Sequence, residues 1–157
     1  MIRAMRPDDK DAVMTLIRDT AFFIEDEVKV AEELIDVYLN DPEQRDYRIV
    51  VIEDDSGKPV GYLTWGPTPL TEGTYDIYWM AVSPFAQGKG YGKKLLEFVE
   101  GQIRSLGGRL MIIETSGQMK YHPTREFYLK LGYSEVARIP DFYRVGDDRI
   151  IYTKKSK

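Results

Sequence analysis

The sequence predicts an α/β fold built around a strand–helix–strand crossover. Three observations predict it. First, β-rich runs alternate with amphipathic helical runs. Second, residues 74–106 read as a strand, a glycine-rich turn and a strong helix, and third, an apolar strand follows at 110–115. Because parallel neighbours in a sheet need such a crossover connection, the segment 74–115 is expected to form the centre of the fold.

The N-terminal part is predicted to contain one strand and two helices. The strand covers Ile2–Met5, and Pro7-Asp8-Asp9 opens the first helix with Asp8 or Asp9 as its cap. Apolar residues at helical spacing mark the inward faces, which are Ala12, Val13, Leu16 and Ile17 in the first helix and Ala31, Leu34, Ile35 and Tyr38 in the second. The second helix ends before Asp41-Pro42.

Strands dominate the middle of the chain. Residues 47–53 and 59–66 are β-rich and flank the hairpin turn Asp54-Asp55-Ser56-Gly57. A third strand, rich in aromatic residues, covers 74–82. The predicted sheet therefore receives three consecutive strands before the crossover helix.

The remaining elements follow the crossover. The clearest helix covers 91–106, and its apolar face consists of Leu95, Leu96, Val99, Ile103 and Leu106. A further helix runs from His122-Pro123 to Leu131, and residues 133–139 and 149–153 form the last strands. The lone His122 is expected to be an exposed residue at a helix start rather than a catalytic base.

The composition is that of one globular domain over residues 1–157. Hydrophobic residues make up 43% and charged residues 31%, enough to bury a core without crosslinks. The chain has no cysteine, which excludes disulfides, thiolate metal sites and an acyl-cysteine intermediate, and no metal is expected. A net charge of −4 argues against a nucleic-acid partner. Without a signal peptide or a membrane span in the sequence, a cytoplasmic protein with no membrane partner is expected.

The turn between residues 82 and 91 has the features of an anion-binding site. Its glycines allow a ligand to approach the backbone, and the first N–H groups of the following helix point at that ligand. Lys89, Lys93 and Lys94 add positive charge. Residue counting excludes a Walker A loop, which would need glycine at Gln87, and a dinucleotide fingerprint, which would need glycine at Lys93. A plain tight turn with solvated lysines is the alternative interpretation.

The segment Met80–Gly92, with its Gln-x-x-Gly-x-Gly core, resembles the acetyl-CoA motif of the GNAT superfamily of N-acetyltransferases. The segment Tyr121–Tyr133, ending Phe127-Tyr128-Leu129-Lys130-Leu131-Gly132-Tyr133, resembles a later helix of the same family. The predicted element order also matches over nearly the whole chain. The resemblance implies a mixed, mostly antiparallel central sheet with helices on both faces, and an acetyl-CoA-dependent acyltransferase.

The resemblance also implies which residues would contact acetyl-CoA. Backbone amides from Gly88 to Lys93 would hold the pyrophosphate, with Gln87 shaping the loop. The backbone of Met80 and Val82 would pair with the pantetheine arm, and the Met80 N–H would stabilise the developing oxyanion. The implied cofactor-binding residues are Met80, Val82, Gln87, Gly88, Lys89, Gly90, Gly92, Lys93 and Tyr121. Tyr121 stands where many members carry a CoA-contacting asparagine, so the sequence departs from the family pattern at this position.

Three residues are candidates for catalysis. Tyr128 matches the family's frequent general acid, although it could also be a core aromatic. Asp76 and Glu114 are candidate bases, because an amine must lose a proton before it attacks. We favour Asp76, since strand alternation predicts that Asp76, Tyr78 and Met80 share one face, and we expect Glu114 to orient the ammonium. Either carboxylate could instead end a hydrogen-bond network.

The acceptor is expected to be a primary amine of a small molecule or peptide. The apolar and acidic stretch Thr20–Val28 and the aromatic residues Tyr62, Trp65, Tyr75, Tyr78 and Trp79 are the predicted entry surface. The acids of that stretch could instead stabilise a helix start. Two other functions remain open: a catalytically inactive CoA-binding regulator and an interaction module. A homodimer is also predicted, since the aromatic strands offer apolar surface.

Overall fold

Seven strands form one mixed sheet in the computed structural model, which describes residues 1–156, and they follow the order β1-β2-β3-β4-β5-β7-β6. The strands are β1 (Ile2–Ala4), β2 (Arg48–Glu53), β3 (Pro59–Pro67), β4 (Thr74–Val82), β5 (Leu110–Ser116), β6 (Ser134–Arg144) and β7 (Asp147–Lys155). All neighbouring pairs are antiparallel except β4 and β5, which are parallel. The predicted fold class and the order of elements are confirmed.

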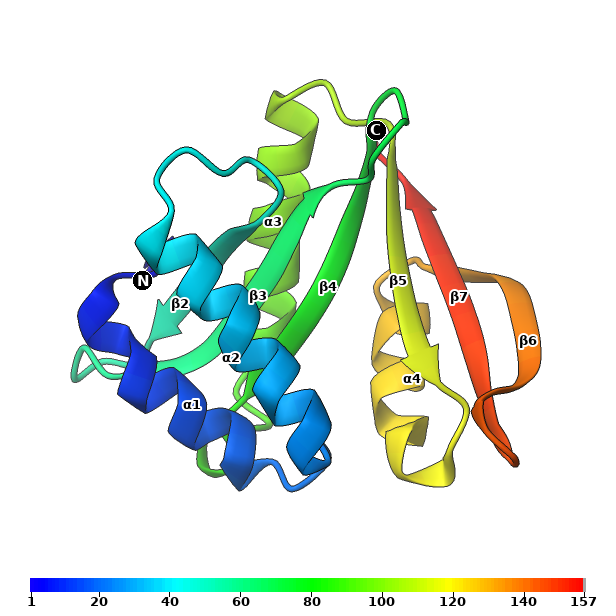
Figure 1. Cartoon of the computed structure of the whole chain (residues 1–157), viewed down its shortest axis with the longest axis horizontal. Helices are drawn as coiled ribbons and strands as arrows, with labels where there is room; N and C mark the ends of the chain where they lie inside the picture. Colours follow the sequence, from blue (N-terminus) through cyan, green and yellow to red (C-terminus); the bar gives the residue numbers. More distant parts are fainter. Residues whose placement is uncertain (157) are drawn as a thin grey trace.

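Helices cover both faces of this sheet (Figure 1). They are α1 (Lys10–Asp19), α2 (Glu25–Asn40), α3 (Tyr91–Ser105) and α4 (His122–Lys130), with three short 3-10 helices, η1 (Pro7–Asp9), η2 (Pro84–Ala86) and η3 (Met119–Tyr121). Residues of α1 and α2 form one core cluster with the sheet, and residues of α3 and α4 form the other. Within residues 1–156, no helix has both the length and the apolar character needed to span a membrane.

The crossover helix α3 packs as predicted, with one exception. Leu95, Leu96, Val99 and Ile103 are fully buried, and burying such a side chain stabilises a fold by about 1.5–3 kcal/mol. Leu106 is 48% exposed, so its predicted place on the apolar face is wrong. The helix ends at Ser105, and the backbone turns away at Gly107, where φ is +80°.

The parallel strands β4 and β5 are paired over only part of their length. Their register covers Thr74–Ile77 and Leu110–Ile113, after which the two strands diverge toward the lower end of Figure 1. The β3–β4 register steps from Thr64↔Trp79 to Trp65↔Ile77, which leaves Tyr78 as the extra residue of a β-bulge. A bulge bends its strand and increases the local twist, which accounts for the divergence.

The last two strands are longer than the sequence predicts. β6 and β7 form a hairpin at the outer edge of the sheet, and every residue of β6 is exposed. A strand exposed along its whole length lacks the alternation of buried and exposed residues that locates strand ends in a sequence. The extension carries Tyr143 and Arg144 to the end of the sheet where β4 and β5 are apart.

Candidate active site

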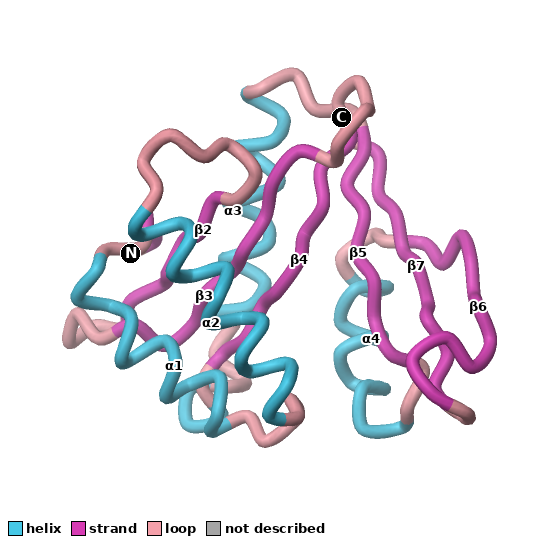
Figure 2. Tube along the Cα trace, viewed as in Figure 1, coloured by secondary structure: helices cyan, strands magenta, loops and turns pink. Residues whose placement is uncertain are grey.

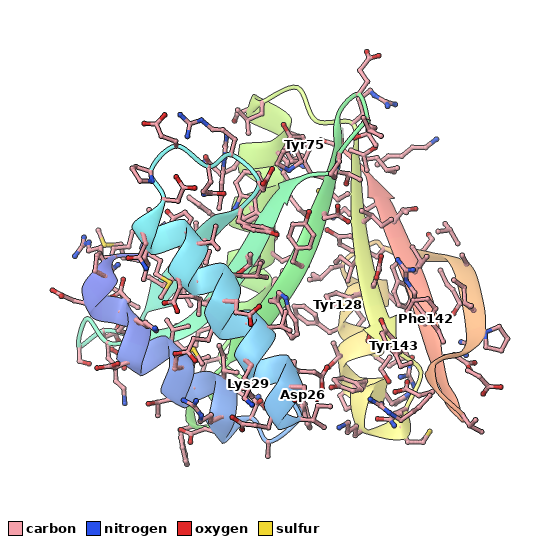
Figure 3. All side chains as sticks on the ribbon, in the orientation of Figure 1. Asp26, Lys29, Tyr75, Tyr128, Phe142 and Tyr143 are labelled. Atoms are coloured by element: carbon pink, nitrogen blue, oxygen red, sulfur yellow. The ribbon has the colours of Figure 1, made fainter. Side chains whose placement is uncertain are left out.

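A pocket of about 550 Å³ lies where β4 and β5 diverge. Its walls come from the start of α2, from β4, β5 and η3, from α4, and from the β6–β7 hairpin. Figure 3 shows Asp26 on the α2 side of this region and Tyr128 and Tyr143 on the opposite side. Seven lining residues are aromatic, namely Phe22, Phe23, Tyr78, Trp79, Tyr121, Tyr128 and Tyr143.

The main chain of β4 is open along the pocket. Ser83 N donates to Val60 O at 2.8 Å, so the facing pair Val82 and Gly61 is one that exchanges no hydrogen bonds. Because such pairs alternate in an antiparallel ladder, the N–H and C=O groups of Val82 and Met80 point away from β3, toward the gap. Gln87 Nε2 donates to Val82 O at 3.3 Å, which holds the loop against the strand end. The other main-chain N–H and C=O groups of Met80 and Val82 can pair with an extended ligand, which would lie beside β4 like an added strand.

The glycine-rich turn leads into α3 with left-handed backbone. Gly88 has φ of +79° and Gly90 has φ of +82°, and a Cβ added at either would meet no atom within 4 Å. Gly90 is the N-cap of α3, and the first helical hydrogen bond runs from Lys94 N to Gly90 O at 3.0 Å. The N–H groups of the preceding helical residues therefore have no partner in the helix. With exposed Lys89 and Lys93 beside them, they fit a phosphate group.

Gly92 serves a different purpose from the other two glycines. A Cβ at this position would approach the Phe127 ring at 3.4 Å. The absence of a side chain therefore lets the start of α3 lie close to α4. This contact joins the glycine turn to the helix that carries Tyr128.

Tyr128 is both a core residue and a pocket residue. Its side chain is 7% exposed, and its ring lies 6.0 Å from the Tyr133 ring and 6.2 Å from the Tyr152 ring, measured between centroids. The Tyr133 hydroxyl donates to Glu100, whereas the Tyr128 hydroxyl has no hydrogen-bond partner within residues 1–156. Burial raises the pKa of Tyr128, so the phenol is fully protonated at neutral pH.

Glu114 lines the pocket with Tyr128 and Met80. It lies on β5 and forms an ion pair with Arg149 of β7 through its Oε1 atom. Its side chain is 37% exposed. The structure therefore brings this carboxylate to the same pocket as the candidate acid.

Asp76 does not line this pocket, and its predicted place on the same face as Met80 is wrong. The bulge at Tyr78 inverts the alternation of β4, so Met80 packs with the α3 cluster while Trp79 and Ala81 pack with the α1–α2 cluster. Asp76 Oδ2 accepts a hydrogen bond from Thr68 Oγ1 at 2.7 Å. Burial, reinforced by the nearby Asp76 carboxylate, raises the pKa of Tyr78 to about 12.

Tyr121 connects two segments that are far apart in the chain. Its hydroxyl donates to Phe22 O at 3.1 Å, and Lys120 Nζ donates to the same oxygen at 2.9 Å. The α1–α2 loop and the segment between β5 and α4 lie at the same end of the molecule in Figure 2. Burial raises the pKa of Tyr121 to about 12. Tyr121 therefore bridges the two sides of the pocket.

Part of the predicted entry surface lines the pocket. Phe22, Phe23 and Trp79 line the pocket, as does Tyr78, whereas Tyr62 and Trp65 are buried with exposures of 1% and 2%. Tyr75 packs against the α3 cluster, far from Tyr128 in Figure 3. His122 is exposed at the start of α4, as expected.

The sequence reasoning missed every pocket residue of the β6–β7 hairpin. Tyr143, Arg144 and Asp147 reach the pocket from the β6–β7 hairpin. Asp147 is buried and accepts hydrogen bonds from Ser116 Oγ and from Arg144 Nη1, the latter at 2.6 Å. A buried aspartate between a glycine and a charged residue has no local sequence signal, because its partner Ser116 is 31 positions away.

Comparisons with known proteins agree with this geometry. The model of the acetyltransferase (GNAT) family matches residues 11–133. A solved structure from Desulfovibrio desulfuricans, described as an acetyltransferase of the same family, is 44% identical with a TM-score of 0.94, covering 100% of this chain and 99% of that one. An aminoglycoside 6'-N-acetyltransferase solved with coenzyme A has 20% identity and a TM-score of 0.76, over 100% of this chain and 97% of that one, which shows a common fold.

A curated relative matches a shorter segment. It is the tRNA uridine(34) acetyltransferase of Methanocaldococcus jannaschii, 41% identical over 68 residues, which are 43% of this chain and 10% of that protein. The matched segment thus spans about a tenth of that relative. The family match covers most of the present chain and includes the glycine turn, Glu114 and Tyr128. The chain therefore belongs to the acetyltransferase (GNAT) family, whose general reaction is the transfer of an acetyl group from acetyl-CoA.

Proposed function

We propose that this protein transfers the acetyl group of acetyl-CoA to a primary amine by direct attack in a ternary complex. The observation that carries the proposal is the convergence of three groups on one pocket: the open main chain of Met80, the Tyr128 hydroxyl and the Glu114 carboxylate. The absence of cysteine supports direct attack, because no thiol is present to carry the acetyl group.

The residues that would hold acetyl-CoA follow from the open backbone groups. The N–H groups of the Gly88–Lys93 segment would hold the pyrophosphate, with Lys89 and Lys93 adding positive charge. The main chain of Met80 and Val82 would pair with the pantetheine arm. When bound, acetyl-CoA supplies an acetyl carbon that is activated as a thioester.

The two proton transfers are assigned to two side chains of the pocket lining. Glu114 would accept the proton of the acceptor ammonium, directly or through water, and Tyr128 would donate its phenolic proton to the leaving sulfur. The base is needed because a lysine-like amine has a pKa of about 10.4, so only about 1 in 10³ molecules is neutral at pH 7. The location of Asp76 outside the pocket lining supports Glu114 as the base instead.

The pocket walls support an acceptor that carries an apolar part. Seven aromatic side chains offer apolar area and ring faces that attract an ammonium group. Most lining charges already have partners: Glu27 accepts from Ile24 N, Asp147 from Arg144, and Lys120 donates to Phe22 O. An acceptor with a primary amine and an apolar body fits these walls.

A screen of amine pools with acetyl-CoA tests the proposal. Products are identified by mass spectrometry, and CoA release is followed in parallel. Acetylation of amines with apolar bodies is expected. CoA binding in calorimetry without any transfer would favour a CoA-binding regulator, and a folded protein that binds no CoA would favour an interaction module.

The homodimer, the single domain over residues 1–157 and the cytoplasmic location stay predictions. Sedimentation at tens of micromolar protein checks the homodimer.

A further inference from the structure

A chain of contacts leads from the outer strand of the sheet to the pocket. The Phe142 ring of β6 lies over the Arg149 guanidinium, 4.8 Å from Cζ to the ring centroid. Arg149, on β7, forms the ion pair with Glu114 of β5. Phe142 also contacts Tyr143 edge-to-face, with centroids 5.0 Å apart, and Tyr143 lines the pocket. Arg149 itself does not line the pocket, so it can reach an acceptor only through Glu114.

An irregularity in β6 places Phe142 over Arg149. The β6–β7 register steps from Ile139↔Arg149 to Arg144↔Asp147, which leaves residues 140–143 outside the ladder. Asp141 in this bulge has φ of +55°, and both its backbone N–H and its side chain are hydrogen-bonded. Its N–H donates to Asp148 Oδ1 at 3.0 Å, and its Oδ1 accepts from Gly146 N at 2.8 Å. The bulge is therefore a defined structure that supports the ring.

The guanidinium of Arg149 is oriented by its two neighbours. Its Nε atom is buried and has no hydrogen-bond partner within residues 1–156, so this atom adds no polar contact that would fix the direction of the guanidinium. Arginine stacks on aromatic faces through its planar group, and lysine cannot reproduce that geometry. The Phe142 ring on one side and the Glu114 carboxylate at the tip are the contacts that remain.

We propose that Arg149, stacked on Phe142, is a positioning residue that holds Glu114 for the acetyl transfer. The proposal rests on the proposed function, in which Glu114 accepts the proton of the acceptor amine. Arg149 engages Oε1 of Glu114, which leaves Oε2 for the amine or a bridging water. A glutamate that is 37% exposed would otherwise rotate between several side-chain conformations. Tyr143, held against Phe142, shapes the wall beside it.

A double-mutant cycle tests this role. The variants Arg149→Met, Glu114→Gln and their combination are assayed with acetyl-CoA and 2-phenylethylamine, a probe with one amine and an apolar ring. Misplacement of a catalytic group by about 1 Å can cost roughly 10²-fold, so Arg149→Met should lower kcat/KM by about 10- to 100-fold in the Glu114 background. In the Glu114→Gln background the same change should cost less than about twofold. Arg149→Lys should restore only part of the loss.

A control comes from α3. Arg104 is exposed near the end of that helix, and it does not line the pocket. Arg104→Met should leave kcat/KM unchanged. Equal losses from Arg149→Met in both Glu114 backgrounds would overturn the positioning role, because the effect would then not pass through Glu114.

A structural readout keeps the proposal testable if no amine is acetylated. Crystal structures of the wild type and of Arg149→Met are compared at the Glu114 side chain. A single ordered conformer in the wild type and several conformers, or one turned out of the pocket, in the variant would support the role. The same Glu114 conformer in both structures would overturn it. Failure of the wild type to acetylate any amine would count against the proposed function alone.

Discussion

The Tyr121 hydroxyl donates a hydrogen bond of 3.1 Å to the main-chain oxygen of Phe22, a residue 99 positions earlier in the chain. The two rings also lie against each other, with centroids 5.7 Å apart. This contact joins the α1–α2 loop to η3 across the pocket. It gives Tyr121 a structural role that its sequence position did not suggest.

Removing the Tyr121 hydroxyl should weaken binding of the acceptor more than binding of CoA. In Tyr121→Phe the ring contact stays and Lys120 still donates to Phe22 O. A typical hydrogen bond contributes about 0.5–1.5 kcal/mol, so the free energy of unfolding should change little. The acceptor KM should rise several-fold. Steady-state kinetics and CoA calorimetry measure both effects. A loss of CoA affinity with an unchanged acceptor KM would instead support a direct CoA contact by Tyr121.

Gly90 should be required for CoA binding. Its φ of +82° is costly for any other residue, by about 1–2 kcal/mol, and Gly90→Asp adds negative charge where the pyrophosphate would bind. CoA affinity measured by calorimetry should fall at least about tenfold. Gly101→Ala is the matched control, because Gly101 lies inside α3 with open space around it and should gain about 0.5–1 kcal/mol in stability. Unchanged CoA affinity in Gly90→Asp would contradict the loop assignment.

Tyr128→Phe should separate catalysis from packing. The ring contacts with Tyr133 and Tyr152 stay in place, and the lost hydroxyl has no hydrogen-bond partner within residues 1–156. Loss of a general acid typically lowers kcat by about 10²–10⁴-fold, while CoA affinity and the melting temperature should be little changed. Near-normal kcat in this variant would make Tyr128 a core residue only.

The two carboxylates should differ in their pH profiles. Glu114→Gln should flatten the acidic limb of the kcat/KM profile, with partial rescue at high pH where free amine is abundant. Asp76→Asn should leave the profile unchanged, since Asp76 bonds to Thr68 outside the pocket lining. The opposite result would return the base to Asp76. A kcat/KM profile that is unchanged in both variants would mean that water accepts the proton.

Stability should decrease above about pH 10 because three tyrosines are buried. Burial raises the pKa values of Tyr62, Tyr128 and Tyr133, and in Tyr133 the Glu100 carboxylate adds to the effect. In the unfolded chain each phenol ionises near pH 10, so above that pH the unfolded state binds fewer protons than the native state and stability falls. Each such tyrosine contributes about 1.4 kcal/mol per pH unit.

Denaturant titrations between pH 8 and 11 measure this slope. The three tyrosines contribute equally to the pH dependence of the free energy of unfolding in this range, so Tyr62→Phe should reduce their joint contribution by about one third. The free energy of unfolding of this variant at pH 8, where the phenols are not ionised, serves as its reference. Stability that stays level up to pH 11 would show that the phenols ionise without unfolding.

Much of the fold was predictable because its signals are local. The face of α1 and most of the face of α3 follow from apolar residues three and four positions apart, and the start of α3 follows from the glycine turn. The glycine turn and Tyr128 were identified from short motifs for the same reason. The mixed, mostly antiparallel sheet agrees with the fold that the resemblance implied, and adjacent strands in the chain are mostly adjacent in the sheet.

The composition of the pocket depended on contacts that no short segment encodes. A single extra residue, Tyr78, inverts the side chains of β4 and separates Asp76 from Met80, although the alternation in the sequence looks regular. Glu114 meets Arg149 only because β5 pairs with β7, and Phe142 reaches Arg149 only because β6 bulges. The chain's local patterns thus specified the elements and the glycine turn, whereas strand register and the long-range packing of the sheet decided which charged and aromatic side chains face the pocket.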